Sequence, residues 1–204
     1  MRSVAFVAGL LFLSYAFNSC NVCSCKKVPC PAFEDVDFQT WFAAYQSSQQ
    51  SIFKYQSSFD TITLAAPQKN ETYEASQGCF GGNEGCMMTF SIWSNEVTAS
   101  SRQKLSISYA GGPNSSSISL RVMGFNCSAK DVADQGLVLD PGTYTSNYSA
   151  SLTLNGTSFN NVQLITRDTI IDRFMDQPYK VYLSKGAGLI AYEMYPGRQL
   201  WVKQ

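Results

Sequence analysis

Three aspartates in the C-terminal part of the chain are the clearest candidates for acid and base chemistry. Asp168, Asp172 and Asp176 follow one another at intervals of four residues, which would align them along one face of a helix. Paired carboxylates can serve as general acid and general base without histidine, as in glycoside hydrolysis. Arginines lie between these acids, and a solvated, charge-balanced connection is the simpler interpretation of the segment. A histidine-free hydrolase is therefore one hypothesis for this chain.

The chain contains no histidine, and this absence excludes several kinds of site. It removes Ser-His-Asp and Cys-His catalytic machinery, histidine general bases and imidazole metal ligands. A Ser-Lys dyad at Lys104 would be chemically feasible, but serine is so abundant that its proximity carries little weight. The 15 basic residues balance the 15 acidic ones, without the basic excess that nucleic-acid binders usually gather on one face. We therefore expect no catalytic triad, no metal, no cofactor and no nucleic-acid partner.

The amino terminus has the layout of a signal peptide. Arg2 supplies a positive charge ahead of an apolar run from Val4 to Phe17. This run of about 14 residues is shorter than the ~20 that a permanent membrane-spanning helix needs. A buried core helix is the alternative interpretation, but such a helix would carry a polar face, and this run has almost none. Residues 1–19 are thus predicted to be a signal peptide that directs export.

A cysteine follows the apolar run closely. The segment Phe17-Asn18-Ser19-Cys20 resembles the lipobox of bacterial lipoproteins, and Val22-Cys23-Ser24-Cys25 is a second candidate. The resemblance implies that the thiol of Cys20, or alternatively that of Cys25, carries diacylglycerol and that this cysteine becomes the first residue of the mature chain. Each buried CH₂ group contributes about 0.8 kcal/mol, so two or three acyl chains would anchor the chain firmly. The expected partner is therefore a membrane, reached through the lipid.

The cysteines form an N-terminal cluster and a dispersed set of three. An even number remains whichever candidate carries the lipid, so counting does not choose between them. An exported chain meets an oxidising compartment, which favours disulfides. Cys79 and Cys86 flank a glycine-rich loop, and we expect a disulfide between them that fastens a turn. Zinc is disfavoured, because zinc ribbons pair two CxxC knuckles and only one occurs here. The pairing of the others stays open, namely Cys23, Cys25, Cys30 and Cys127.

Short runs of alternating apolar and polar residues dominate the chain after Gln49, as in Lys104–Tyr109. Strands of this kind bury one face and expose the other, as antiparallel sheets do. We therefore expect an all-β fold, mainly antiparallel, as a curved sheet, sandwich or half-open barrel of about ten strands. The predicted strands are Ser51–Gln56, Thr61–Ala65, Thr72–Ala75, Met87–Trp93, Lys104–Tyr109, Ile118–Met123, Tyr144–Tyr148, Ser151–Leu154, Val162–Arg167, Tyr179–Ser184, Leu189–Met194 and Gln199–Val202.

The segment between the signal peptide and these strands has two parts. Residues 20–31 contain two prolines and no periodicity, so we interpret them as a tether between the lipid and a single domain over residues 32–204. The apolar spacing in Phe33–Tyr45 predicts one short N-terminal helix. Further along, Asn155-Gly156 is the clearest hairpin turn, because both residues tolerate positive φ. Pro-Gly turns are predicted at Pro141 and Pro196.

Two stretches resemble known proteins. The segment from Cys23 to Phe33, with Phe38-Gln39-Thr40-Trp41-Phe42 after it, resembles the opening of small Bacteroidota-type lipoproteins of no established function. The end, from Val181 through Glu193 to Trp201, is similar to a closing hairpin of exported bacterial β-proteins. These resemblances imply export and a β architecture, and they carry no activity.

The terminal hairpin also has a physical interpretation of its own. Tyr182, Leu189, Tyr192 and Trp201 can supply an aromatic and apolar face. Such a face either packs in the core, which is the simpler interpretation, or forms a platform for a sugar or peptide.

The leading hypothesis is a lipid-anchored domain at the outer membrane that faces the periplasm or the cell surface and binds or scaffolds. Its further partner would be a small apolar ligand in a concave sheet or an envelope protein. The hydrolase would act on envelope polymers. A secreted eukaryotic glycoprotein is the rival hypothesis, because N-x-S/T sequons occur at Asn70, Asn114, Asn126, Asn147 and Asn155.

Overall fold

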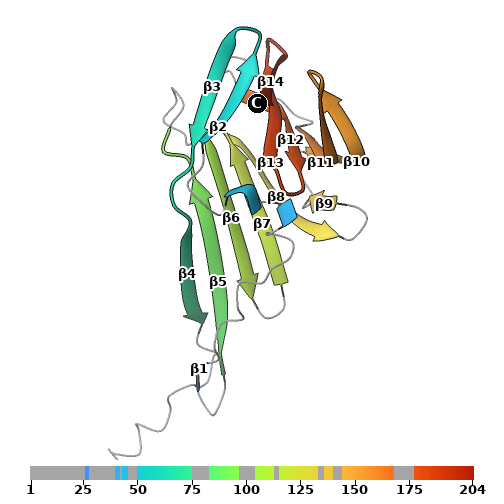
Figure 1. Ribbon diagram of the computed structural model, residues 1–204. Helices are drawn as coiled ribbons and strands as arrows, with labels where there is room; N and C mark the ends of the chain where they lie inside the picture. The colour runs from blue at the N-terminus through green and yellow to red at the C-terminus, as the bar shows by residue number, and fades with distance from the viewer. Residues whose placement is uncertain are drawn as a thin grey trace, which may run out of the picture.

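The computed structural model of the protein describes residues 26–27, 40–41, 43–45, 50–74, 83–96, 104–112, 115–132, 136–139, 144–167 and 177–204. These residues form two seven-stranded sheets, which we name sheet A and sheet B (Figure 1). All strand pairs are antiparallel except the short β1 beside β5. The sheets do not close into one continuous ladder. The all-β, mainly antiparallel class is thus confirmed.

Sheet A has the strand order β1-β5-β6-β7-β8-β9, and β4 also pairs with β5. Its strands are β1 (Lys26–Lys27), β4 (Gln68–Glu74), β5 (Asn83–Trp93), β6 (Leu105–Gly112), β7 (Ser115–Val122), β8 (Phe125–Val132) and β9 (Gly136–Leu139). Sheet B has the order β10-β11-β12-β13-β14-β2-β3. Its strands are β2 (Gln50–Tyr55), β3 (Ser58–Thr63), β10 (Tyr144–Leu154), β11 (Thr157–Arg167), β12 (Gln177–Ser184), β13 (Gly188–Tyr195) and β14 (Gln199–Lys203).

Three strands lie outside the predicted set, and each had a weak sequence signal. β8 buries Phe125, Cys127 and Ala129 on alternate positions, but cysteine and alanine are small apolar residues that give little contrast. β9 is only four residues long, and β1 only two. β10 is continuous where two short strands were predicted. Because Lys26 and Lys27 form β1, part of the predicted tether belongs to sheet A.

The predicted N-terminal helix is not confirmed. Of the segment Phe33–Tyr45 the structure describes Thr40, Trp41 and a 3-10 helix, η2 (Ala43–Tyr45). The rest of that segment lies outside the described residues, as do the predicted turn at Pro141 and residues 1–19.

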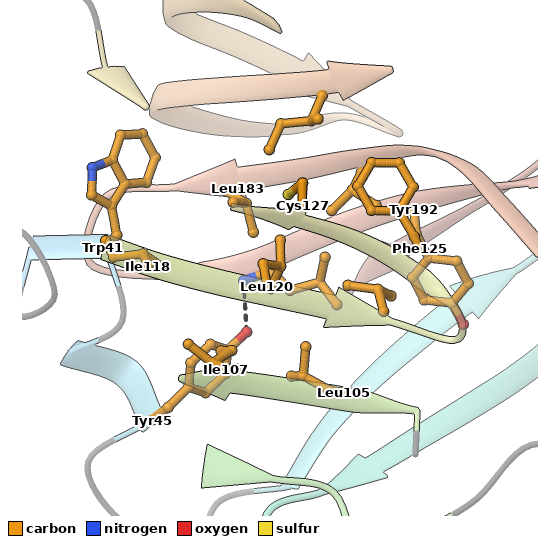
Figure 2. Packing of buried hydrophobic residues seen from close by; sticks show 14 of the residues in the cluster. Trp41, Tyr45, Leu105, Ile107, Ile118, Leu120, Phe125, Cys127, Leu183 and Tyr192 are labelled. Carbon is orange, nitrogen blue, oxygen red and sulfur yellow. Dashed lines mark hydrogen bonds between the residues drawn. The ribbon is translucent and has the colours of Figure 1, made fainter. Parts of the chain in front are cut away.

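The main hydrophobic core lies between the two sheets (Figure 2). Ile107 and Leu120 project from sheet A, and Leu183 and Tyr192 project from sheet B. Their alternation with polar neighbours follows from the pleat, which points successive side chains to opposite faces. The fully buried members with the largest side chains are Trp41, Tyr45, Tyr192, Phe53, Phe125, Ile62, Leu64, Ile92, Leu105 and Ile107.

A second apolar cluster covers the other face of sheet B. The end of the β10–β11 hairpin contributes Leu154 and Phe159, which pack with Tyr182, Ile190 and Val202. The turn of this hairpin is Asn155-Gly156, as predicted, and both residues have positive φ, 49° and 84°. The strands of sheet B therefore bury apolar side chains on both faces.

Side chains join the two sheets at β9. The backbone N–H of Leu137 donates to Gln163 Oε1 at 3.0 Å, and Ser146 Oγ donates to the Leu137 carbonyl at 3.2 Å. Gln163 Nε2 also donates to Ser146 Oγ. Because Gln163 is buried, its amide replaces the water that would otherwise satisfy this sheet edge.

The η2 segment is fixed to the turn between β12 and β13. The backbone N–H of Leu189 donates to the hydroxyl of the buried Tyr45 at 2.6 Å, and that of Gly186 donates to the Thr40 carbonyl at 2.5 Å. Gly188 has a φ of 68°, and a Cβ there would stand 2.3 Å from the Tyr45 ring. Glycine at this position thus allows the close approach of Tyr45.

Gly188→Ala should destabilise the protein by about 2–5 kcal/mol, because left-handed strain adds to a steric clash. The matched control is Gly186→Ala. Its φ of 80° is also positive, but nothing lies within 4 Å of the new Cβ, so strain alone should cost about 1–2 kcal/mol. Urea unfolding monitored by tryptophan fluorescence measures both variants, and equal losses would contradict the proposed contact.

Candidate functional site

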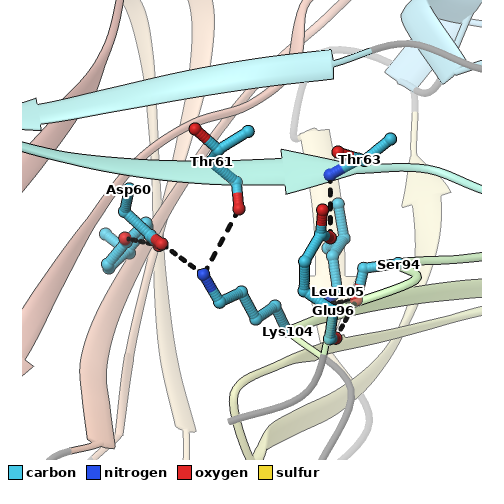
Figure 3. A network of polar contacts seen from close by, with 8 residues as sticks. Asp60, Thr61, Thr63, Ser94, Glu96, Lys104 and Leu105 are labelled. Atoms are coloured by element: carbon cyan, nitrogen blue, oxygen red, sulfur yellow. Dashed lines mark hydrogen bonds and ion pairs between the residues drawn. The ribbon is translucent and has the colours of Figure 1, made fainter.

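A polar network of the described residues crosses from sheet B to sheet A (Figure 3). Its centre is Asp60 on β3. Lys104, which immediately precedes β6, forms an ion pair with Asp60 Oδ1 and also donates to the Thr61 carbonyl at 3.3 Å. The hydroxyl of Tyr192 on β13 donates to Asp60 Oδ2 at 2.5 Å. Both carboxylate oxygens are therefore engaged.

Local strand geometry explains why Asp60 points inward. In β3 it lies two residues from Ile62, so the pleat places both side chains on the same face. Ile62 is fully buried in the main core. A carboxylate beside that core must be paired, since an isolated buried charge costs several kcal/mol. This pattern, a charge on the apolar face of a strand, is the signal by which the sequence could have revealed the network.

Glu96 forms the second half of the network. Its Oε2 accepts a hydrogen bond from the Thr63 backbone N–H at 2.9 Å, while the Asn95 N–H donates to the Thr63 carbonyl at 2.9 Å. Ser94 Oγ donates to the Glu96 carbonyl at 2.9 Å and accepts from the Leu105 N–H at 3.1 Å. These contacts satisfy backbone groups at the end of β3, where the chain leaves sheet B for β4 of sheet A.

The pKa values of Glu96 and Tyr192 are shifted by burial and by the hydrogen bonds that these side chains make within the network. Burial by itself would raise the pKa of Glu96, but the hydrogen bonds from Thr63, assisted by its own backbone and by Lys104, hold it below its usual value. Burial, together with the hydrogen bond and charge of Asp60, raises the pKa of Tyr192 well above its usual value. The Tyr192 phenol is therefore neutral and the Glu96 carboxylate charged at neutral pH. The arrangement clamps strands and leaves no group poised as a base or nucleophile.

A Ser-Lys dyad at Lys104, which carried little weight in the sequence, does not form in the described part of the chain, where Lys104 bonds to Asp60 and Thr61. Cys127 is a free, buried thiol, and burial raises its pKa to about 12, so it is no nucleophile. Cys86 is disulfide-bonded. Cys127 is the only other described cysteine, so the partner of Cys86 lies outside the described residues. Cys79 also lies outside them, and the Cys79–Cys86 bridge stays a prediction.

Several other predicted site residues also fall outside the described part. They are Cys20 and Cys25, the candidates for lipid attachment, and the three acids Asp168, Asp172 and Asp176. The cysteines at positions 23 and 30, whose pairing was left open, fall outside it as well.

The aromatic residues of the terminal hairpin are packed into the domain. Tyr192 lies in the main core, where its ring stacks on Trp201 with centroids 6.1 Å apart, and Leu189 is in the same cluster. Tyr182 belongs to the cluster on the opposite face of sheet B. These residues therefore do not form one exposed platform, and core packing explains them.

The sequons lie at the surface wherever the structure describes them. The asparagines at positions 70, 126, 147 and 155 are all exposed, and position 114 lies outside the described residues. Asn70 is on β4 and Asn147 on β10, which are edge strands of sheets A and B. A glycan acceptor must be exposed, but asparagine side chains are usually exposed in any protein.

The described residues do not bring three acidic or cysteine side chains together as a metal site would require. None of their helical segments has the length and apolar character needed to span a bilayer. Comparison with family models, with curated proteins and with solved structures finds no match to this chain. The candidate site must therefore be interpreted from its own contacts.

Lys104→Met should destabilise the protein by about 1–3 kcal/mol, because it leaves the half-buried Asp60 charge without its cation. Lys69→Met is the matched control, since Lys69 pairs with Glu71 at 3.2 Å on the exposed face of β4, and it should cost no more than about 1 kcal/mol. A double variant with Asp60→Asn should cost less than the sum of the single changes. Denaturant unfolding measures the two lysine variants, Asp60→Asn and the double variant against the wild type, and equal costs for the two lysine variants would contradict the role of the Asp60–Lys104 pair.

Acid should weaken the contact of Glu96 with Thr63. A carboxylate whose pKa is lowered by folding stabilises the protein above its unfolded-state pKa, about 4.3. That contribution is lost as the pH falls through the folded-state value. Glu96→Gln should therefore lose less stability than the wild type on acidification below about pH 4.3. Thermal unfolding between neutral and acid pH tests this, and parallel stability curves for the two proteins would refute it.

Proposed function

We propose that this chain is an exported, lipid-anchored lipoprotein whose β domain binds or scaffolds at the cell envelope, on the periplasmic or the outer face. The position of Cys20, directly after Ser19 and the apolar run that ends at Phe17, carries the proposal. Balanced charge offers no polybasic alternative for holding the chain on anionic lipid, so the acyl chains would supply the attachment.

The cysteine chemistry supports export. Disulfides persist in oxidising compartments and are rare in the bacterial cytoplasm. Cys86 is disulfide-bonded, although its partner is not described. The outer membrane is the membrane that we propose for the anchor, by resemblance of residues 23–33 to small Bacteroidota-type lipoproteins.

The described polar side chains favour a binding role over catalysis, because they are paired with one another or protonated. Asp60 forms an ion pair with Lys104 and accepts a hydrogen bond from the Tyr192 hydroxyl. The Cys127 thiol is protonated in the core. The hydrolase hypothesis depends on acids outside the described residues. The apolar cluster fills the space between β6–β8 and β11–β13, which favours an envelope protein as partner over a small apolar ligand held there.

The exposed sequons favour the secreted glycoprotein as the second candidate. The two candidates differ in the modification they require: diacylglycerol on a cysteine thioether, or N-linked sugar on an asparagine amide. The intact mass of the mature chain distinguishes them in one measurement.

Expression in a bacterium with lipoprotein processing should give a membrane-bound chain that starts at lipidated Cys20. An inhibitor of signal peptidase II should leave the precursor with residues 1–19 attached. Cys20→Ser should abolish lipidation and release the chain from the membrane fraction, whereas Cys25→Ser should not. Mass spectrometry and fractionation are the measurements, and maturation that ignores the inhibitor would overturn the proposal.

A further inference from the structure

The pairing of β1 with β5 limits where the lipid anchor can lie. Lys26 and Lys27 align in parallel with Asn83 and Glu84, the first residues of β5. Neighbouring strands are about 4.8 Å apart, so the N-terminal segment is held at that end of sheet A. In Figure 1, β1 lies beside the start of β5, at the end of the molecule remote from the β2–β3 hairpin.

The chain between the lipid and β1 is short. Six residue steps separate Cys20 from Lys26, and such a segment spans at most about 22 Å whatever its conformation. If Cys25 carries the lipid, a single step separates it from Lys26. Either cysteine therefore holds the start of β5 close to the bilayer.

The opposite end of the molecule lies far beyond that reach. β5 rises by about 34 Å from Asn83 to Trp93, and Ser94 pairs with Leu64 where β3 ends. The β2–β3 hairpin continues from there away from β5 (Figure 1). Its far end is thus roughly 50 Å from β1 by strand rise. Two exposed large apolar side chains, Phe59 and Ile52, lie on this hairpin.

We infer that the bilayer faces the end of the molecule formed by β1, the start of β5 and the end of β4, and that the β2–β3 hairpin is the outermost part. The inference rests on the proposed lipid attachment. It assigns Phe59, 64% exposed, and Ile52 to the aqueous side, so these apolar residues do not insert into the anchoring membrane. Any partner protein would meet this hairpin first.

Energy transfer to the membrane tests the orientation. A fluorescent amino acid is placed at Thr72 on β4 or at Ser57 in the β2–β3 turn, both exposed. The mature lipidated protein is then reconstituted in phosphatidylethanolamine and phosphatidylglycerol vesicles with acceptor-labelled lipid. Transfer should be several-fold greater from position 72 than from position 57. Equal transfer, or greater transfer from position 57, would overturn the inference.

A second variant tests the cause. Lys26→Pro with Lys27→Pro removes the backbone donors of β1, so the next described attachment of the chain is Thr40 on the β12–β13 turn. The difference between the two probe positions should shrink, and an unchanged difference would show that β1 does not set the orientation. The intact mass separates the two proposals: absence of lipid overturns the lipoprotein itself, whereas lipid with equal transfer overturns only the orientation.

Discussion

The arrangement of the two sheets depends on the contacts that the Asp60 carboxylate makes. Asp60 lies on β3, an edge strand of sheet B, and binds Lys104, which immediately precedes β6 of sheet A, and Tyr192 in β13. A half-buried ion pair gains little net energy over apolar packing, but a misplaced partner leaves a charge unpaired. The network therefore favours the observed placement of β3, which satisfies both carboxylate oxygens.

At β9 the two sheets are joined by hydrogen bonds of uncharged side chains instead of an ion pair. Gln163 and Ser146 satisfy the backbone of Leu137 where β9 meets sheet B, so the described polar groups at both junctions are bonded within the protein. Tyr45 and Gly188 fix the segment that precedes β2. These contacts fix both junctions between the sheets and the segment that precedes β2.

Much of the fold could be predicted from local pattern, and most of the site could not. Alternation located the described strands from β2 to β7 and from β10 to β14 within a few residues, because the pleat repeats every two residues. The small side chains of β8 gave no such contrast. The alternation pattern does not by itself single out Asp60 or Glu96, although the position of Asp60 on the same face as the buried Ile62 indicates a paired charge. The expected N-terminal helix rested on apolar spacing and on Asp35 or Asp37 as a cap of its first turn, and the described part of that segment shows only η2 and two residues before it.

The sequence by itself determined the class of the domain and the layout of its amino terminus, since both depend on the order of neighbouring residues. Only the tertiary structure decided which strands share a sheet and which charges meet. Lys104 is 44 residues from Asp60, and Tyr192 is 132 residues from it. Contacts at such separations depend on the whole strand order, because nothing in the local sequence specifies which distant side chain will lie opposite a buried charge.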